Sequence, residues 1–217
     1  MRNIKILFVK AKYKKYLDPS KINLISKKLP KEIAIVYSIQ YEDVAKQLFK
    51  KLSKDHKITS LIQLLGCSKL KFSKSTKTIL LVSDGLFHAK SLAFESGLDV
   101  CLYNIYNDTL RKISSEDIGP LEKKQKVAYA NYLNSDILGI LISLKPGQQK
   151  FKTALNLKEK LQNKTGKKSY LFLSNNILGS ELENFPNIKC WINTACPRLD
   201  LIEDIRIINS IDINNKN

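Results

Sequence analysis

Two cysteines occupy positions that suit chemistry better than packing. Cys196 follows an apolar run near the C-terminus and is itself followed by Pro197 and Arg198. Cys67 likewise ends an apolar run, more than a hundred residues earlier. A nearby cation favours the thiolate, which is the form of cysteine that binds a metal or attacks an electrophile. Each cysteine is therefore a candidate metal ligand, although a buried cysteine at a strand end would give the same pattern at Cys67.

The other two cysteines, Cys101 and Cys190, lie inside apolar runs. We expect both to be buried as small hydrophobic side chains. No two of the four cysteines form a Cys-x-x-Cys pair, which argues against a zinc ribbon. Four cysteines in an intracellular chain also do not suggest a framework of disulfides.

A polar segment directly after another apolar run could bind a ligand. Ser83, Asp84 and Gly85 permit a tight turn that presents backbone N–H groups. Phe87 and the titratable ring of His88 follow closely. An ordinary turn with a surface histidine would have the same sequence, so both interpretations stay open.

A second polar segment, Lys145-Pro146-Gly147-Gln148, precedes a predicted helix. Backbone N–H groups at a helix N-terminus attract anions, so this segment is a candidate anion site. The alternative is a plain connection between a strand and a helix. The chain has no Ser-His-Asp set, Walker loop or Gly-x-Gly-x-x-Gly motif.

These candidates lie between elements that alternate along the chain. Short β-branched apolar runs alternate with longer, lysine-rich amphipathic segments, which is typical of an α/β fold with a parallel sheet. The predicted strands are 33–38, 58–65, 78–82, 98–103, 137–144, 170–173 and, as the last strand, 189–193. The predicted helices are 21–29, 41–54, 121–134, 151–162 and 178–184. Open α/β sheets bind ligands outside the carboxyl ends of their strands, so we expect 83–88, 145–149 and 196–198 to face one shared cleft.

The polar stretch 107–120 interrupts this pattern and predicts a domain boundary. The expected domains are two similar α/β units, 31–115, which carries Cys67, and 116–217, which carries Cys196. Residues 1–30 fit neither unit, because a lone strand at 4–9, a basic linker and a short helix do not make a domain. We interpret residues 1–30 as the remnant of a domain that is missing.

The composition limits the class of protein. At 217 residues the chain can bury one large core or two domains of about 100 residues each. No apolar run approaches the roughly 18 residues of a membrane helix and no signal peptide is evident, so we expect a soluble, cytoplasmic protein without a membrane partner. The formal charge of +17 is compatible with an acidic or polyanionic partner, but solvated lysine surfaces explain it better, because the lysines are spread along the chain rather than clustered. No RNA-binding motif is visible, so no specific nucleic-acid partner is predicted.

Five segments together resemble one family. They occur in one order at compatible spacings: Gln40, 64–67, 83–88, 145–148 and 194–198. This series resembles the archaeal diphthamide synthase family, the subunit 2-like radical enzyme of diphthamide biosynthesis, over about residues 4 to 204. Each motif alone is modest evidence, whereas five in the same order are specific.

The resemblance implies three similar α/β domains around a central [4Fe–4S] cluster, with one cysteine from each domain. Cys67 would be the ligand of the second domain and Cys196 that of the third, and three thiolates leave one iron open. The cluster would cleave S-adenosylmethionine reductively, and the 3-amino-3-carboxypropyl radical would add to a histidine of translation elongation factor 2. The chain would thus be a transferase that acts in the first step of diphthamide formation. The residues implied to bind the co-substrate are Gln40, Ser83, Asp84, Gly85, Phe87, His88, Lys145, Gly147, Gln148 and Arg198.

The chain departs from the family in two ways. The family's first domain, with its own cysteine, is missing, so we expect a separate polypeptide to supply that domain and the third ligand. A dimer is also compatible with the resemblance. In addition, Asn104-Ile105-Tyr106 stands where the family tends to have Asp-Pro-Tyr. No catalytic side chain is assigned.

Two other hypotheses stay open. The chain could be a non-catalytic accessory or scaffold subunit of the same complex, although the presence of both Cys67 and Cys196 favours a component that binds the cluster. The other hypothesis is a basic, RNA-associated α/β protein, and it depends on charge alone.

Overall fold

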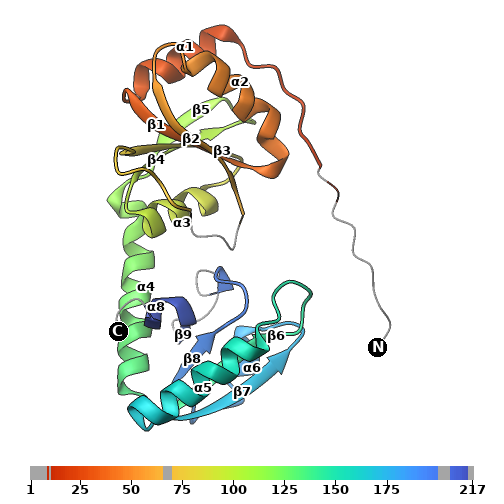
Figure 1. Ribbon diagram of the computed structural model, residues 1–217, viewed down its shortest axis with the longest axis vertical. Coiled ribbons are helices and arrows are strands. Elements are labelled where there is room, and N and C mark those ends of the chain that lie inside the picture. Colours follow the sequence, from red (N-terminus) through yellow and green to blue (C-terminus); the bar gives the residue numbers. More distant parts are fainter. Residues whose placement is uncertain (1–8, 10, 66–69, 200–205, 215–217) are drawn as a thin grey trace. The chain divides into compact units, whose positions relative to one another are not determined.

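The computed structural model describes residues 9, 11–65, 70–199 and 206–214. The chain divides into two units, Met1–Ile118 and Gly119–Asn217, and each is built around its own mainly parallel sheet (Figure 1). The predicted fold class, two small α/β sheets with flanking helices, is thereby confirmed. Cys67 and all but the last residue of the predicted strand 4–9 lie outside the described residues.

The sheet of the first unit has its strands in the order β2-β1-β3-β4-β5. They are β1 (Glu32–Ser38), β2 (Lys57–Leu64), β3 (Thr78–Ser83), β4 (Asp99–Asn104) and β5 (Thr109–Lys112). The first four are parallel, and β5 runs antiparallel to β4. β1 and β3 are continuous apolar runs because helices cover both faces of the sheet and bury both strands almost completely.

Separate helices cover the two faces of this sheet. They are α1 (Pro19–Lys28), the short 3-10 helix η1 (Ile39–Tyr41), α2 (Glu42–Leu52) and α3 (Leu86–Ser96). Ile25 of α1 and Leu48 of α2 belong to the core on one face, whereas Ala89 and Leu92 of α3 belong to the core on the other. The helix predicted at 21–29 therefore packs on the first sheet, and the predicted domain boundaries themselves stay predictions.

The sheet of the second unit has parallel strands in the order β7-β6-β8-β9. They are β6 (Ile137–Ser143), β7 (Lys168–Ser174), β8 (Cys190–Asn193) and β9 (Ile207–Asn209). The helices are α4 (Ser115–Asn134), which begins before the unit boundary, α5 (Phe151–Thr165), α6 (Gly179–Leu182) and α8 (Ser210–Asn214). Ala128 of α4 and Leu157 of α5 pack on one face of the sheet, and Leu182 of α6 packs on the other.

One contact in the second sheet requires a glycine. Trp191 in β8 is fully buried, and its ring lies against Gly139 in the neighbouring strand β6. A Cβ atom at position 139 would overlap that ring. Phe172 and Phe185 pack edge-on against Trp191, with ring centroids 4.8 and 5.9 Å away, and leave the indole little room to move.

The structure differs from the sequence-based expectations in several elements. α3, β5, β9 and α8 were not predicted, and β9 shows that 189–193 is not the last strand. α4 begins at Ser115 rather than at 121, because Ser114 and Asp117 form a capping box. The hydroxyl of Ser114 accepts the N–H of Asp117 (3.3 Å), and the carboxylate of Asp117 accepts the N–H of Ser114 (3.1 Å). In the described part of the chain, no helix has the length and apolar character needed to cross a membrane.

Candidate functional site

The clearest candidate site is a cavity of about 210 Å³ at the carboxyl ends of the strands of the second sheet. The segments that follow β6, β7 and β8 all contribute to its walls. Lys145, Gln148, Cys196 and Arg198, all predicted from the sequence, line it together with Asn175. The position agrees with the rule that parallel sheets bind ligands beyond the carboxyl ends of their strands.

Side-chain hydrogen bonds hold the loop that carries Cys196. The amide of Asn193 donates to the carbonyl of Cys196 (2.7 Å) and to the side-chain oxygen of Asn209 (2.7 Å). The oxygen of Asn193 accepts a backbone N–H of the same loop (2.9 Å). Thr194 donates through its hydroxyl and its N–H to one carbonyl of β6 (2.8 and 3.1 Å). Because Asn193 and Thr194 are buried, these bonds fix the loop to the sheet.

The turn 145–148 forms another wall of the cavity. The carbonyl of Lys145 accepts the N–H of Gln148 (3.0 Å), and Gly147 has a φ of 79°, in the left-handed region that favours glycine. Proline before that glycine presets its own φ, so this sequence encodes a type II turn. The hydroxyl of Ser143 accepts the N–H of Lys145 (3.1 Å) and ties the turn to the end of β6.

Exposure separates Cys196 from the two cysteines inside strands. Cys101 in β4 is 7% exposed and Cys190 in β8 is 0% exposed, as predicted. Burial raises the pKa of Cys101, and it raises the pKa of Cys190 to about 12, so both stay protonated near neutral pH. Cys196 is a free, half-buried cysteine at the cavity. Of these three cysteines, Cys196 alone can offer its sulfur to a metal.

The first unit gathers polar residues at the carboxyl ends of β1, β3 and β4. Ser83 is fully buried, and its hydroxyl lies 3.1 Å from that of Ser38 at the end of β1. Ser83 also donates to the carboxylate of Asp84 (3.4 Å). Asn104, at the end of β4, donates to the carbonyl of Asp84 (3.0 Å), and Gly85 then caps α3. These bonds position the carboxylate of Asp84 at the edge of the sheet.

A cluster of tyrosines adjoins the same strand ends. Tyr41 is buried, and its hydroxyl donates to that of Tyr106 (3.2 Å). Burial, this hydrogen bond and the nearby Asp84 together raise the pKa of Tyr41, so its hydroxyl stays neutral. The ring of Tyr13 packs edge-on against both tyrosines, with centroids 5.9 and 5.6 Å away. Gln40 is tied to this cluster because its carbonyl accepts the N–H of Tyr13 (2.8 Å).

The remaining predicted residues are Phe87, His88 and Cys67. Phe87 and His88 lie in the first turn of α3 with ring centroids 5.5 Å apart, and Phe87 is 41% exposed. Cys67 falls within 66–69, outside the described residues. The shared cleft expected between segments of the two units stays a prediction.

Sequence reasoning missed the residues that hold these loops in place. Asn193 and Thr194 could have been noticed, because a polar pair at the end of a buried strand and just before the cysteine is unusual. Asn209 gave no comparable indication, because β9 is short. The role of Asn209 depends on its hydrogen bond with Asn193, which lies in a distant segment of the chain. Tyr41 was predicted only as the first residue of the helix 41–54 and not as a member of a polar network.

The donors of the second unit fit one corner of an iron–sulfur cluster. Such clusters are held by cysteine thiolates, and the half-buried Cys196 lines the cavity together with Lys145 and Arg198. Among residues 9, 11–65, 70–199 and 206–214, no group of three or more His, Cys, Asp or Glu side chains is placed to hold a metal ion.

Comparison with known proteins gives relatives that are named as 2-(3-amino-3-carboxypropyl)histidine synthase or as its subunit 1. The chain is 27% identical over 147 residues to the 2-(3-amino-3-carboxypropyl)histidine synthase of Pyrococcus horikoshii, which covers 68% of this chain and 42% of that protein. It is 23% identical over 215 residues to subunit 1 of the synthase of Gallus gallus, which covers 92% of this chain and 51% of that one. The chain thus spans about half the length of the curated relatives it matches, or less.

Two solved structures share the fold. They are the crystal structures of Dph2 from Pyrococcus horikoshii alone and with a 4Fe-4S cluster, with TM-scores of 0.74 and 0.73 and 24% identity. The match covers 90% of this chain and 60% and 59% of those chains. The family model of the diphthamide synthesis protein matches residues 1–206, nearly the whole sequence. This chain, with its two α/β sheets and its cysteine at a strand end, therefore belongs to the diphthamide synthesis protein family.

Proposed function

We propose that this chain is a component of 2-(3-amino-3-carboxypropyl)histidine synthase, the activity that the names of its relatives state. The reaction would transfer the 3-amino-3-carboxypropyl group of S-adenosylmethionine to a histidine of translation elongation factor 2, as the first step of diphthamide formation. One observation carries the proposal: the accessible Cys196 lines a cavity at the carboxyl end of a parallel sheet, beside Lys145 and Arg198.

The proposal assigns Cys196 and Cys67 as two thiolate ligands of a [4Fe–4S] cluster. When bound, the reduced cluster would supply the electron that cleaves S-adenosylmethionine to a 3-amino-3-carboxypropyl radical. Cys101 and Cys190 are buried within strands and cannot complete the ligand set while those strands stay folded. The third thiolate would then come from a further α/β domain outside the described residues, for which we propose a partner polypeptide as the source.

In each unit by itself, charged residues at the carboxyl ends of the strands have the chemistry that the amino-acid end of S-adenosylmethionine requires. The group that is transferred carries a carboxylate and an amine. Lys145 and Arg198 line the cavity as cations that would hold the carboxylate, and Gln148 adds an amide donor. Asp84 presents a carboxylate that would pair with the amine. We keep the remaining predicted residues as proposed contacts of the co-substrate: Gln40, Ser83, Gly85, Phe87, His88 and Gly147.

The first experiment tests the cluster. The full chain is reconstituted anaerobically with iron and sulfide, alone and together with a candidate domain-supplying partner, and its iron content and EPR spectrum are measured. Cys67→Ala and Cys196→Ala should each lower the iron content and alter the EPR signal. Cys101→Ala is the matched control and should retain both, because its sulfur is buried in the sheet. Unchanged iron and EPR in both ligand variants would refute the assignment.

The second experiment separates catalysis from an accessory role. The reconstituted complex is incubated with S-adenosylmethionine, a reductant and elongation factor 2, and the added group is detected by mass spectrometry. Modification that is lost with Cys196→Ala supports the enzyme. A chain that co-purifies with a synthase and supports full modification in the Cys196→Ala form would instead be an accessory subunit.

A further inference from the structure

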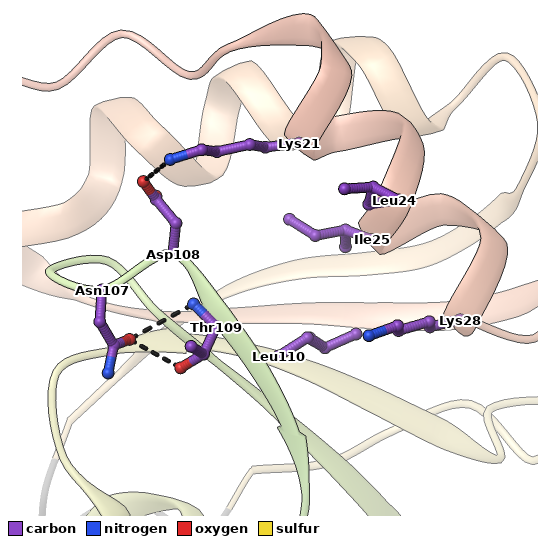
Figure 2. A pocket seen from close by; sticks show the side chains of 8 residues that line it. All are labelled: Lys21, Leu24, Ile25, Lys28, Asn107, Asp108, Thr109 and Leu110. Carbon is purple, nitrogen blue, oxygen red and sulfur yellow. Dashed lines mark hydrogen bonds and ion pairs between the residues drawn. The ribbon is translucent and has the colours of Figure 1, made fainter.

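A separate cavity of about 360 Å³ lies between α1 and the hairpin that joins β4 to β5 (Figure 2). Lys21, Leu24 and Lys28 contribute to it from α1, and Asp108 and Leu110 contribute from the hairpin. None of these residues belongs to the site proposed for the cluster or its co-substrate. We infer that this cavity is a docking site for an acidic segment of a partner protein, with one apolar side chain of that segment as its anchor.

The walls of the cavity are held in place before any ligand arrives. The carboxylate of Asp108 accepts hydrogen bonds from Lys15 (2.7 Å), from Tyr103 (2.6 Å) and from Lys21, the last of which spans the cavity rim in Figure 2. Asp108 has a φ of 54°, so its backbone is fixed in the left-handed region. Below it, Asn107 accepts both the N–H and the hydroxyl of Thr109 (3.3 and 2.6 Å). A preformed site loses less conformational freedom when a ligand binds.

The cavity offers apolar surface to an anchor. Leu24 is 60% exposed, although Ile22 and Ile25 in the same helix are each only 4% exposed. Figure 2 shows Leu24 and Ile25 on α1 and Leu110 on the facing strand around the open space. The volume lies at the lower end of the range of about 300–1,000 Å³ typical of ligand pockets, which suits one large side chain and its flanking backbone. An aliphatic or aromatic anchor would remove Leu24 from water.

The charge around the cavity selects an acidic partner. Asp108 offsets the charges of Lys15 and Lys21 near one end of the cavity. Lys28 lies at the other end and makes no ion pair with any of the described residues. The charged residues that line the cavity are Lys21, Lys28 and Asp108, which gives the lining a net positive charge. Carboxylates that flank the apolar anchor would meet Lys28.

The test uses the full chain and a fluorescein-labelled peptide with a central leucine flanked by glutamates. We expect saturable binding by fluorescence anisotropy at low salt, with a Kd below about 1 mM. NMR chemical-shift changes should concentrate in residues 21–28 and 107–110. Replacing the peptide's leucine by serine, or its glutamates by glutamine, should each weaken binding at least about fivefold.

Two lysines in the last turn of α1 provide a matched pair of variants. Lys28→Glu should weaken peptide binding at least about fivefold, whereas Lys27→Glu, with the same change of charge outside the cavity lining, should weaken it less than about twofold. Leu24→Ser tests whether Leu24 contacts the peptide's apolar anchor, and it should also weaken binding. Because Leu24 is exposed, the variant should fold, which circular dichroism checks. The inference is overturned if no saturable binding occurs, if Lys27→Glu acts as strongly as Lys28→Glu, or if a short polyuridylate displaces the peptide by occupying the same lysines.

Discussion

At the scale of single residues, burial decides which cysteines can react. Cys190 is fully buried with a pKa of about 12, whereas Cys196 lines an open cavity. At about pH 8, iodoacetamide should therefore modify Cys196 at least about tenfold faster than Cys190 or Cys101. Peptide mapping by mass spectrometry over a time course measures each site separately.

The cysteine prediction has a direct control. Cys196→Ser should remove the fast site and leave the slow rates at Cys101 and Cys190 unchanged. Equal rates at Cys190 and Cys196 in the folded protein would contradict the assignment of Cys196 as the accessible ligand.

Asp108 is the residue whose charge matters most to the first unit. Burial alone would raise its pKa, but hydrogen bonds from Lys15, Lys21 and Tyr103 outweigh burial and hold the pKa well below 3.8. A carboxyl group whose pKa is lowered by folding stabilises the fold above its unfolded pKa, and this contribution disappears as the pH falls through its folded pKa. Asp108→Asn should thus lower the free energy of unfolding by ~2 kcal/mol at neutral pH, and the difference should shrink below about pH 4.

Guanidinium titrations of both proteins at neutral and acidic pH measure this difference. Asparagine also tolerates a left-handed backbone, so the variant changes the charge without adding strain. Asp55→Asn, in an exposed turn, is the control and should change stability by less than about 0.5 kcal/mol. An Asp108→Asn deficit of the same size at both pH values would show that the charge is not its cause.

At the scale of elements, the contact between β6 and β8 fixes β8, the strand that leads to Cys196. Gly139→Ala would drive a Cβ atom into the ring of Trp191, whose aromatic neighbours restrict its movement. We expect a loss of ~1–3 kcal/mol in the free energy of unfolding, measured by denaturant titration with tryptophan fluorescence. Wild-type stability in the Gly139→Ala variant would contradict this prediction and would show that the ring of Trp191 can move aside.

The strands also show which parts of the fold could be predicted from the sequence. β1, β3 and β6 were predicted within a residue or so because strands covered on both faces are continuous apolar runs. β5 and β9 were missed because an exposed edge strand and a three-residue strand leave no such run. Lys145, Gln148, Cys196 and Arg198 were found because strand ends converge in a parallel sheet. Asn209 was not, because its bond to Asn193 joins segments that only tertiary folding brings together.

At the scale of the whole molecule, a formal charge of +17 should govern encounters with acidic proteins. If elongation factor 2 is the substrate, its association with the complete complex should weaken as salt rises from about 50 to about 300 mM, because screening shortens the range of charge attraction. Biolayer interferometry across this salt series measures the association rate. A rate that ignores ionic strength would show that the lysine surfaces take no part in the encounter.

The hydrogen bonds around Cys196 affect what would happen to the fold if oxygen destroyed a cluster bound there. Asn193, Thr194 and Asn209 hold the loop through bonds to its own backbone and to the sheet, and none of these bonds involves the sulfur. These hydrogen bonds therefore do not require iron. If air destroys a cluster bound here, the empty protein should keep its fold and accept new iron and sulfide, so that damage at this corner can be repaired without synthesis of a new chain.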